Sequence, residues 1–278
     1  MYDCTRQYIN GQWVTSVAGT LHDIINPATE ESIGKVVHGT KDDVDLAVQA
    51  ARAAFEQYSQ WTVEQRLELL GKIDDAYKTR YNDIAAAITA EMGAPITFSQ
   101  KAQTGSGIGH MKATIKALKD LHLEEEVGHS IILREPIGVC GLITPWNWPI
   151  NQIMCKVAPA LAAGCTVVLK PSEIAPVDAT LFTEVLDAAG VPAGVFNLVH
   201  GDGPGVGAAI SAHPDIDMMS FTGSTRAGVL VAKAAADSVK RVAQELGGKS
   251  ANIILESAPL EQAIKHGVRD MFGNTGQS

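Results

Sequence analysis

The segment Phe221-Thr222-Gly223-Ser224-Thr225-Arg226-Ala227-Gly228 follows the apolar run 216–220 and precedes a run rich in alanine and valine. The first run is typical of a buried strand and the second of a helix, so the glycine and hydroxyl cluster lies at a strand-to-helix turn. Backbone N–H groups at a helix start can hold a phosphate, and Gly223 and Gly228 allow close approach of the ligand and of the strand. An ordinary turn capped by Ser224 is the alternative interpretation.

The next segment, Gln244-Glu245-Leu246-Gly247-Gly248-Lys249-Ser250, completes this region. Residues 242–246 form a short, mostly apolar strand that carries one acid, Glu245. A carboxylate beside backbone that can approach a ligand is a candidate general base. A salt-bridged or surface carboxylate is the alternative interpretation of Glu245.

Strands and helices alternate around this region. A strand predicted at 137–143, close after the one at 130–133, precedes this alternation. We then predict strands at 166–169, 195–199, 216–221 and 242–246, and helices at 149–164, 176–189, 204–212 and 225–236. Strands that alternate with helices of this length indicate an α/β fold with a Rossmann-like, doubly wound parallel sheet covered on both faces. Ligands of such sheets bind at the carboxyl ends of the strands, where the motifs of this chain fall.

The N-terminal half is mainly helical after two short β segments. We predict a hairpin at 8–14 with Asn10-Gly11 as its turn, a second turn at 26–29 and a strand at 32–37. Apolar periodicity predicts helices at 41–57, at 62–92 as a pair, and at 104–121. A strand is predicted at 130–133, and the charged run 124–126 is interpreted as a solvated face or a linker.

Composition limits the classes of function. The chain has 278 residues and a net charge of −9, with an isoelectric point near 5.3, which argues against nucleic-acid binding. The 4 cysteines lack paired metal-ligand spacing, so we expect reduced thiols in a cytoplasmic protein and no metal site. The N-terminus shows no secretory signal. The uncharged stretch 136–155 contains prolines and amides, so we expect buried elements there and no membrane span.

Three further motifs lie at predicted strand ends. In Thr144-Pro145-Trp146-Asn147-Trp148-Pro149, two prolines fix a backbone that presents the Asn147 amide, a donor suited to stabilising an oxyanion. A rigid turn in which Asn147 bonds its own backbone is the alternative. Lys170-Pro171-Ser172-Glu173 offers a carboxylate for ribose hydroxyls, or else a helix cap with an ion pair. The loop 201–207 could lie over a flat or phosphorylated ligand, or could be a plain flexible loop.

Together these motifs closely resemble the aldehyde dehydrogenase superfamily in order and spacing, over essentially the whole chain. The resemblance implies three catalytic positions: Asn147 for the oxyanion, Glu245 as the base that activates water, and Lys156. The cofactor-binding residues that it implies are Thr144, Pro145, Trp146, Lys170, Ser172, Glu173, Gly203, Pro204, Gly207, Phe221, Gly223, Ser224, Leu246 and Gly247. Trp148, Gln152 and Cys155 match positions along the aldehyde channel of relatives.

The family mechanism requires a cysteine that attacks the aldehyde, and the resemblance puts this cysteine just beyond Ser278. Either the chain is a piece of a longer enzyme or it is a truncated, non-catalytic nucleotide-binding protein. The resemblance divides the chain into a cofactor-binding domain (1–126 and 145–248), part of an oligomerisation arm (127–144) and the start of a second α/β catalytic domain (249–278). It implies NAD as cofactor, with NADP possible, an aldehyde substrate, and a homodimer or homotetramer. Glu173 favours NAD because a 2′-phosphate would meet its negative charge.

Overall fold

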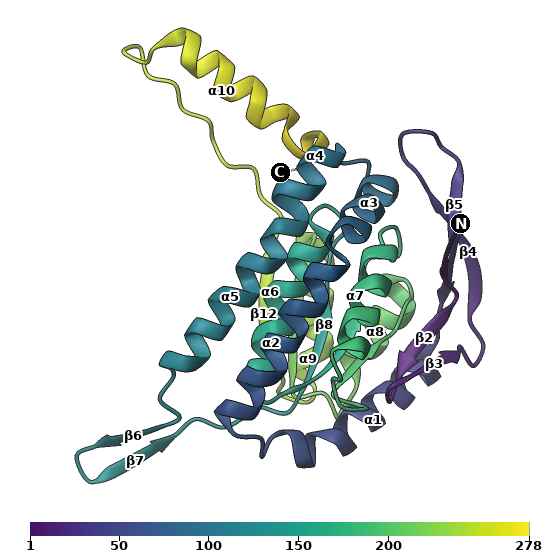
Figure 1. Ribbon diagram of the computed structural model, residues 1–278, viewed down its shortest axis with the longest axis vertical. Coiled ribbons are helices and arrows are strands. Elements are labelled where there is room, and N and C mark those ends of the chain that lie inside the picture. The colour runs from purple at the N-terminus through teal and green to yellow at the C-terminus, as the bar shows by residue number, and fades with distance from the viewer. Residues whose placement is uncertain (278) are drawn as a thin grey trace.

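The computed structural model describes residues 1–277, and a seven-stranded sheet is central to this part of the chain (Figure 1). Its strands stand in the order β12 (Arg241–Leu246), β11 (Met218–Gly223), β8 (Val139–Ile143), β9 (Thr166–Lys170), β10 (Phe196–Leu198), β2 (Arg6–Ile9) and β3 (Gln12–Thr15). The first five are parallel to one another, and β2 pairs antiparallel with both β10 and β3.

The chain winds outward from β8 in both directions. It runs from β8 through β9 to β10, then crosses to the other side of β8 and adds β11 and β12. The strand order therefore reverses between β8 and β11, and a crevice opens at the carboxyl ends of strands on either side of such a point. The predicted doubly wound parallel sheet is confirmed.

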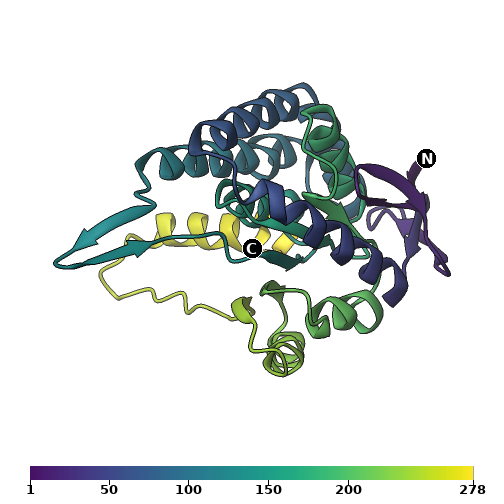
Figure 2. The same cartoon turned by 90° about the horizontal axis from the view of Figure 1, so that it is seen from below.

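Helices cover both faces of the sheet (Figure 2). One face carries α6 (Pro149–Ala162) and α7 (Val177–Ala188), with α2 (Val63–Thr79), α3 (Tyr81–Met92) and α5 (Gly105–Asp120) packed in the same core cluster. The other carries α1 (Lys41–Tyr58), α8 (Ala208–Ala212) and α9 (Thr225–Ala236). Strand residues alternate between the two cores, since Cys140 and Leu142 belong to the first and Val139 and Ile143 to the second.

The N-terminal hairpin forms as predicted. Strands β2 and β3 pair around Asn10 (φ 52°) and Gly11 (φ 75°), both in the left-handed region that a tight hairpin turn requires. A separate sheet of β1 (Tyr2–Cys4), β5 (Ser32–His38) and β4 (Thr20–Ile25) lies beside it. We did not predict β1 or β4, because β1 is very short and β4 is exposed along most of its length.

A two-stranded hairpin of β6 (Glu124–Val127) and β7 (Ser130–Leu133) projects from the body (Figure 1). The run 124–126, which we interpreted as a solvated face or linker, is exposed but forms a strand. We also grouped the strand predicted at 137–143 with this hairpin in the segment 127–144, and that grouping was wrong for β8. All residues of β8 are buried, because β8 pairs with β9 and β11 inside the central sheet, whereas all residues of β7 are exposed in a hairpin that pairs only with β6.

The last elements extend from the opposite end of the molecule (Figure 1). Helix α10 (Leu260–Phe272), which we did not predict, has no buried residue, and the turn 273–276 returns the chain to the body. The predicted helix 204–212 is a π-helical turn, Gly203–Gly207, continued by α8. Shorter pieces are α4 (Ile96–Phe98) and the π-helical turn Ser99–Thr104. Within residues 1–277, every helix is too short or too polar to cross a bilayer.

Candidate active site

A cavity of about 590 Å³ opens where the strand order reverses. Its walls come from the end of β8, the loop before α8, the end of β11 and the first turns of α9. Of the residues predicted to bind a cofactor, the cavity brings together Gly203, Pro204, Gly207, Phe221 and Ser224. The location agrees with the position expected for a ligand of a doubly wound sheet.

Ser224 is the N-cap of α9. Its Oγ accepts a hydrogen bond from the Ala227 amide at 3.2 Å, so the cap of the alternative interpretation forms. The neighbouring glycines are required for close packing: a Cβ on Gly223 would lie 2.6 Å from the Phe221 ring, and one on Gly228 would lie 2.5 Å from Leu246 Cδ2. The helix start therefore lies tightly against the strand ends and borders the cavity.

Lys170 and Glu173 form an ion pair beside this cavity. Lys170 Nζ lies 3.0 Å from Glu173 Oε2 and donates to the Pro171 carbonyl at 2.9 Å. Burial lowers the pKa of Lys170, and the charge of Glu173 opposes that shift. A Cβ on Gly207 would lie 3.7 Å from Lys170 Cδ, which connects the pair to the cavity wall. The ion pair of the alternative interpretation is thus present, and Glu173 stays partly exposed.

Asn147 is held by residues far away in the sequence. Its side-chain amide donates to the Gln277 carbonyl at 2.9 Å. Its own carbonyl accepts from Gln103 Nε2 at 3.0 Å and from Asn274 Nδ2 at 2.9 Å. The alternative in which Asn147 bonds its own backbone is therefore not the arrangement found. We did not predict Gln103 or Asn274 as site residues, and only the fold brings them to this loop.

Glu245 and Lys156 face the opposite side of the sheet from the 590 Å³ cavity. They line a second cavity, of about 870 Å³, together with Cys155 and Ser220. Lys156 is 8% exposed, and its Nζ donates to Ser220 Oγ at 2.9 Å. Burial lowers the pKa of Lys156, while the charges of Cys155 and Glu245 act to raise it. Ser220 was missed because nothing in its sequence context marks it.

The remaining predicted cofactor residues lie at the same end of the sheet without lining the 590 Å³ cavity. Thr144, Pro145 and Trp146 follow β8, Leu246 and Gly247 end β12, and Ser172 is buried after β9. Among residues 1–277, the buried hydroxyls of Thr144 and Thr222 have no hydrogen-bond partner. Orphaned hydroxyls and close-packed glycines at the ends of β8 and β11 are compatible with a polar ligand laid across this edge.

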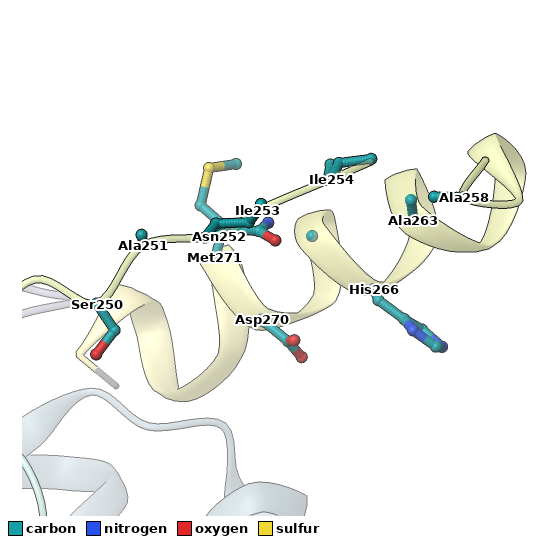
Figure 3. A pocket seen from close by; sticks show the side chains of 11 residues that line it. Ser250, Ala251, Asn252, Ile253, Ile254, Ala258, Ala263, His266, Asp270 and Met271 are labelled. Carbon is teal, nitrogen blue, oxygen red and sulfur yellow. The ribbon is translucent and has the colours of Figure 1, made fainter. Parts of the chain in front are cut away.

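Two further observations concern a third cavity and possible metal ligands. A cavity of about 610 Å³ separates α10 from the segment 250–254, and Figure 3 shows its lining. It contains none of the predicted site residues. In the described part of the chain, no group of three or more His, Cys, Asp or Glu side chains could hold a metal ion.

Comparisons with known proteins agree with this geometry. The sequence pattern of the aldehyde dehydrogenase family matches residues 13–278. The 3-succinoylsemialdehyde-pyridine dehydrogenase of Pseudomonas sp is 58% identical over 279 residues, which cover 100% of this chain. The chain spans 58% of the length of that curated relative.

Solved structures are similar over nearly the whole chain. Aldehyde dehydrogenase C from Pseudomonas syringae, a mutant in complex with NAD+ and octanal, is 50% identical with a TM-score of 0.97, covering 99% of this chain and 57% of that one. An aldehyde dehydrogenase from Bartonella henselae is 48% identical with a TM-score of 0.97, covering 100% of this chain and 59% of that one. On the extent of the sequence match and the identity of these relatives, the chain belongs to the aldehyde dehydrogenase family.

Proposed function

We propose that this chain is part of an enzyme that oxidises an aldehyde to a carboxylic acid with NAD, or with NADP, through a cysteine thiohemiacetal and thioester. The observation that carries the proposal is the hydrogen bond from the Asn147 amide to the carbonyl of Gln277. The family resemblance puts the nucleophilic cysteine just beyond Ser278. Both positions lie outside the described residues. The Asn147 amide is thus held two residues from that position, within reach of an oxyanion formed there.

The cofactor would lie across the carboxyl ends of the strands. Ser224 and the start of α9 would hold its pyrophosphate, Gly203 and Pro204 would border the adenine, and Lys170 and Glu173 would bind the adenosine ribose. The other predicted cofactor residues, Thr144, Pro145, Trp146, Ser172, Gly207, Phe221, Gly223, Leu246 and Gly247, would line its path. The bound nicotinamide supplies hydride acceptance. The NAD+ complex of the Pseudomonas syringae relative supports this type of cofactor.

Catalysis is assigned to three side chains. Asn147 stabilises the oxyanion, and Glu245 takes a proton from the water that releases the acid from the thioester. Lys156, buried and bonded to Ser220, stands beside Glu245 and contributes a positive charge to the same cavity. The octanal of the Pseudomonas syringae complex and the semialdehyde named for the Pseudomonas sp relative support an aldehyde as substrate.

The organisation proposed for the whole protein follows the resemblance. The central sheet with its helices is the cofactor-binding domain, the hairpin 124–133 is part of an oligomerisation arm, and 249–278 begins a catalytic domain. We propose a cytoplasmic homodimer or homotetramer. The hairpin and α10 expose apolar side chains, among them Ile131, Leu133 and Phe272. This exposure supports the proposal that other segments or subunits of the assembly cover them.

Stopped-flow kinetics of Glu245→Gln in the full-length protein test the proposal. We expect deacylation to slow by about 10²–10⁴-fold, so that NAD(P)H forms in a single burst while NAD affinity stays unchanged. Glu56→Gln, an exposed carboxylate on α1, is the matched control and should behave as wild type. Unchanged turnover in Glu245→Gln would remove the base assignment. A full-length protein that binds NAD but never reduces it with any aldehyde would instead favour the non-catalytic nucleotide-binding protein.

A further inference from the structure

Cys140 and Cys165 form a pair of thiols that the proposed reaction does not use. Cys140 lies in β8 opposite Val167 of β9, and Cys165 directly precedes β9. Both cysteines face the α6 side of the sheet, because they pack in the core cluster that contains the buried residues of α6. Both are 3% exposed and belong to the same core cluster. The two side chains are therefore diagonal neighbours, one in β8 and one just before β9.

The surroundings of the two sulfurs differ. Hydrogen bonding from the Cys140 thiol, and from the backbone of Gly138 and Ile137, favours the thiolate of Cys165 against the cost of burial, and the charge of Arg66 acts in the same direction. The pKa of Cys165 is lowered to about 7 as a result. The same hydrogen bond, together with burial, raises the pKa of Cys140. Cys165 is therefore the better nucleophile of the two.

Both thiols border a cavity, although little of their surface is exposed. Cys140 and Cys165 both line the cavity of about 870 Å³. Cys165 precedes the strand ladder and follows Gly164, whose φ is 82°, so its backbone belongs to a turn rather than to the sheet. A turn can adjust to the short sulfur–sulfur distance of a disulfide more easily than two strands in register can.

The other two cysteines lack this arrangement. Burial raises the pKa of Cys4 to about 12, and its sulfur accepts a hydrogen bond from Thr180 at 3.2 Å. Cys155 has a raised pKa, caused mainly by burial. A thiol with a second thiol beside it, at the edge of a cavity, is the arrangement found in oxidant-sensitive cysteines.

We propose that Cys140 and Cys165 are an oxidisable dithiol that reacts with hydrogen peroxide. The Cys165 thiolate attacks the O–O bond, giving a sulfenic acid on Cys165 and releasing hydroxide, which takes up a proton to become water. The Cys140 sulfur then attacks the sulfenic sulfur, forms the disulfide and releases a second water. In sum, two thiols lose two electrons and two protons, and one peroxide is reduced to two waters. The disulfide would join β8 to the turn before β9.

Peptide mapping by mass spectrometry after peroxide treatment of the purified full-length protein tests this proposal. Free thiols are alkylated before and after reduction, so that each cysteine is followed separately. We expect a Cys140–Cys165 linked peptide that disappears with dithiothreitol, formed at least about tenfold faster than any oxidation of Cys4. Free Cys140 and Cys165 after peroxide has oxidised Cys4 in the same sample would overturn the proposal.

Three variants separate the roles of the two thiols. In Cys140→Ser, we expect a sulfenic acid on Cys165 that dimedone traps, and no disulfide. In Cys165→Ser, Cys140 should stay reduced, and its oxidation at the wild-type rate would contradict the assignment of Cys165 as the attacking thiol. Cys4→Ser is the control and should form the disulfide as wild type does. Circular dichroism establishes that each variant is folded, and the wild-type map decides the proposal even if one is not.

Discussion

At the scale of single residues, long-range hydrogen bonds define the site. The Asn147 amide could have bonded its own turn, yet it donates to Gln277, 130 positions away. The Asn147 carbonyl in turn accepts from Gln103 and Asn274. Two bonds to its backbone carbonyl and one from its side-chain amide fix the direction of Asn147, which is what a preorganised oxyanion donor requires.

Glu173 is predicted to select the cofactor. Its carboxylate can accept both ribose hydroxyls of NAD, whereas a 2′-phosphate would meet its charge. We expect Glu173→Gln to raise the Kd of NAD by about tenfold or more, because a hydrogen bond to a charged group is lost. The Kd of NADP should rise by less. Fluorescence titration measures both constants. Equal weakening of the two cofactors would contradict the assignment of Glu173 to the ribose.

At the scale of elements, helix α7 begins without a cap from its own sequence. Pro176 makes no side-chain cap. Instead, Glu91 at the end of α3 accepts hydrogen bonds from the amides of Val177 at 2.6 Å and of Asp178 at 2.9 Å. Burial and the charge of Asp178 raise the pKa of Glu91 well above its usual value, and burial raises that of Asp178 to about 7.

These raised pKa values predict stability that falls as the pH rises. The folded state keeps protons that the unfolded carboxyls lose near pH 4. The contribution of these protons to the free energy of unfolding is therefore full below pH 4, and it is lost as the pH rises through about 7. One proton gives a slope approaching about 1.4 kcal/mol per pH unit. The midpoints of urea unfolding between pH 5 and 8 measure this slope. Asp178→Asn should flatten the profile, and the exposed Asp75→Asn should not; equal profiles in the two variants would contradict the origin assigned here.

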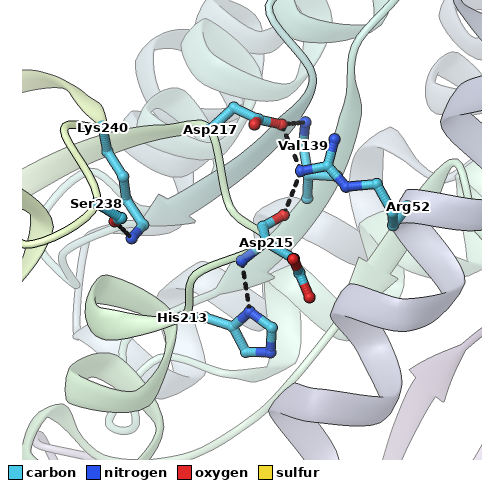
Figure 4. A network of polar contacts seen from close by, with 7 residues as sticks. All are labelled: Arg52, Val139, His213, Asp215, Asp217, Ser238 and Lys240. Carbon is cyan, nitrogen blue, oxygen red and sulfur yellow. Dashed lines mark hydrogen bonds and ion pairs between the residues drawn. The ribbon is translucent and has the colours of Figure 1, made fainter.

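The other ends of the strands are joined by a polar network (Figure 4). Asp217, just before β11, accepts from the Val139 amide and from Arg52 of α1, both at 2.7 Å. Arg52 also donates to the Asp215 carbonyl at 2.5 Å. A single carboxylate thus connects β8, the start of β11 and helix α1.

Gly138 is predicted to be essential for this network. Its φ is 128°, and a Cβ there would lie 1.8 Å from Asp217 Oδ2. We expect Gly138→Ala to lower the free energy of unfolding by about 1–3 kcal/mol from backbone strain alone, measured by urea denaturation. Gly109→Ala is the matched control, because Gly109 is helical with open space around it, and a gain of about 1 kcal/mol is expected. A loss in Gly138→Ala no larger than in the control would rule out this role.

At the scale of the whole molecule, apolar surface is concentrated at the two extensions. On the β6–β7 hairpin, Ile131 and Leu133 are 59% and 61% exposed and point to the same face. Helix α10 exposes Leu260, Ile264 and Phe272. Such surfaces usually mark contacts with other segments or subunits.

The hairpin supplies the test of assembly. We expect Ile131→Lys in the full-length protein to lower the mass of the assembly in light scattering, because it puts a charge into the contact proposed for the arm. His129→Lys changes the tip of the same hairpin without removing apolar surface, so the assembly should persist. An unchanged mass in Ile131→Lys would argue against the hairpin as the assembly contact.

The sequence by itself determined the class of fold and the order of its motifs. Apolar runs such as 166–170 and one-sided helices such as 41–58 follow from local periodicity, which needs no tertiary information. Local turn chemistry likewise predicted the hairpin at Asn10-Gly11. The Ser224 cap was only the alternative interpretation of its turn, and it forms. The resemblance that these motifs carried was then confirmed by the family match.

Only the tertiary structure decided which distant residues meet. It assigned β8 to the central sheet, bonded Asn147 to Gln277, capped α7 with Glu91 and made Cys140 and Cys165 neighbours in one core cluster. The physical reason is the same in each case. Strand order and helix packing bring together residues that are far apart in the chain, and local periodicity carries no information about such contacts.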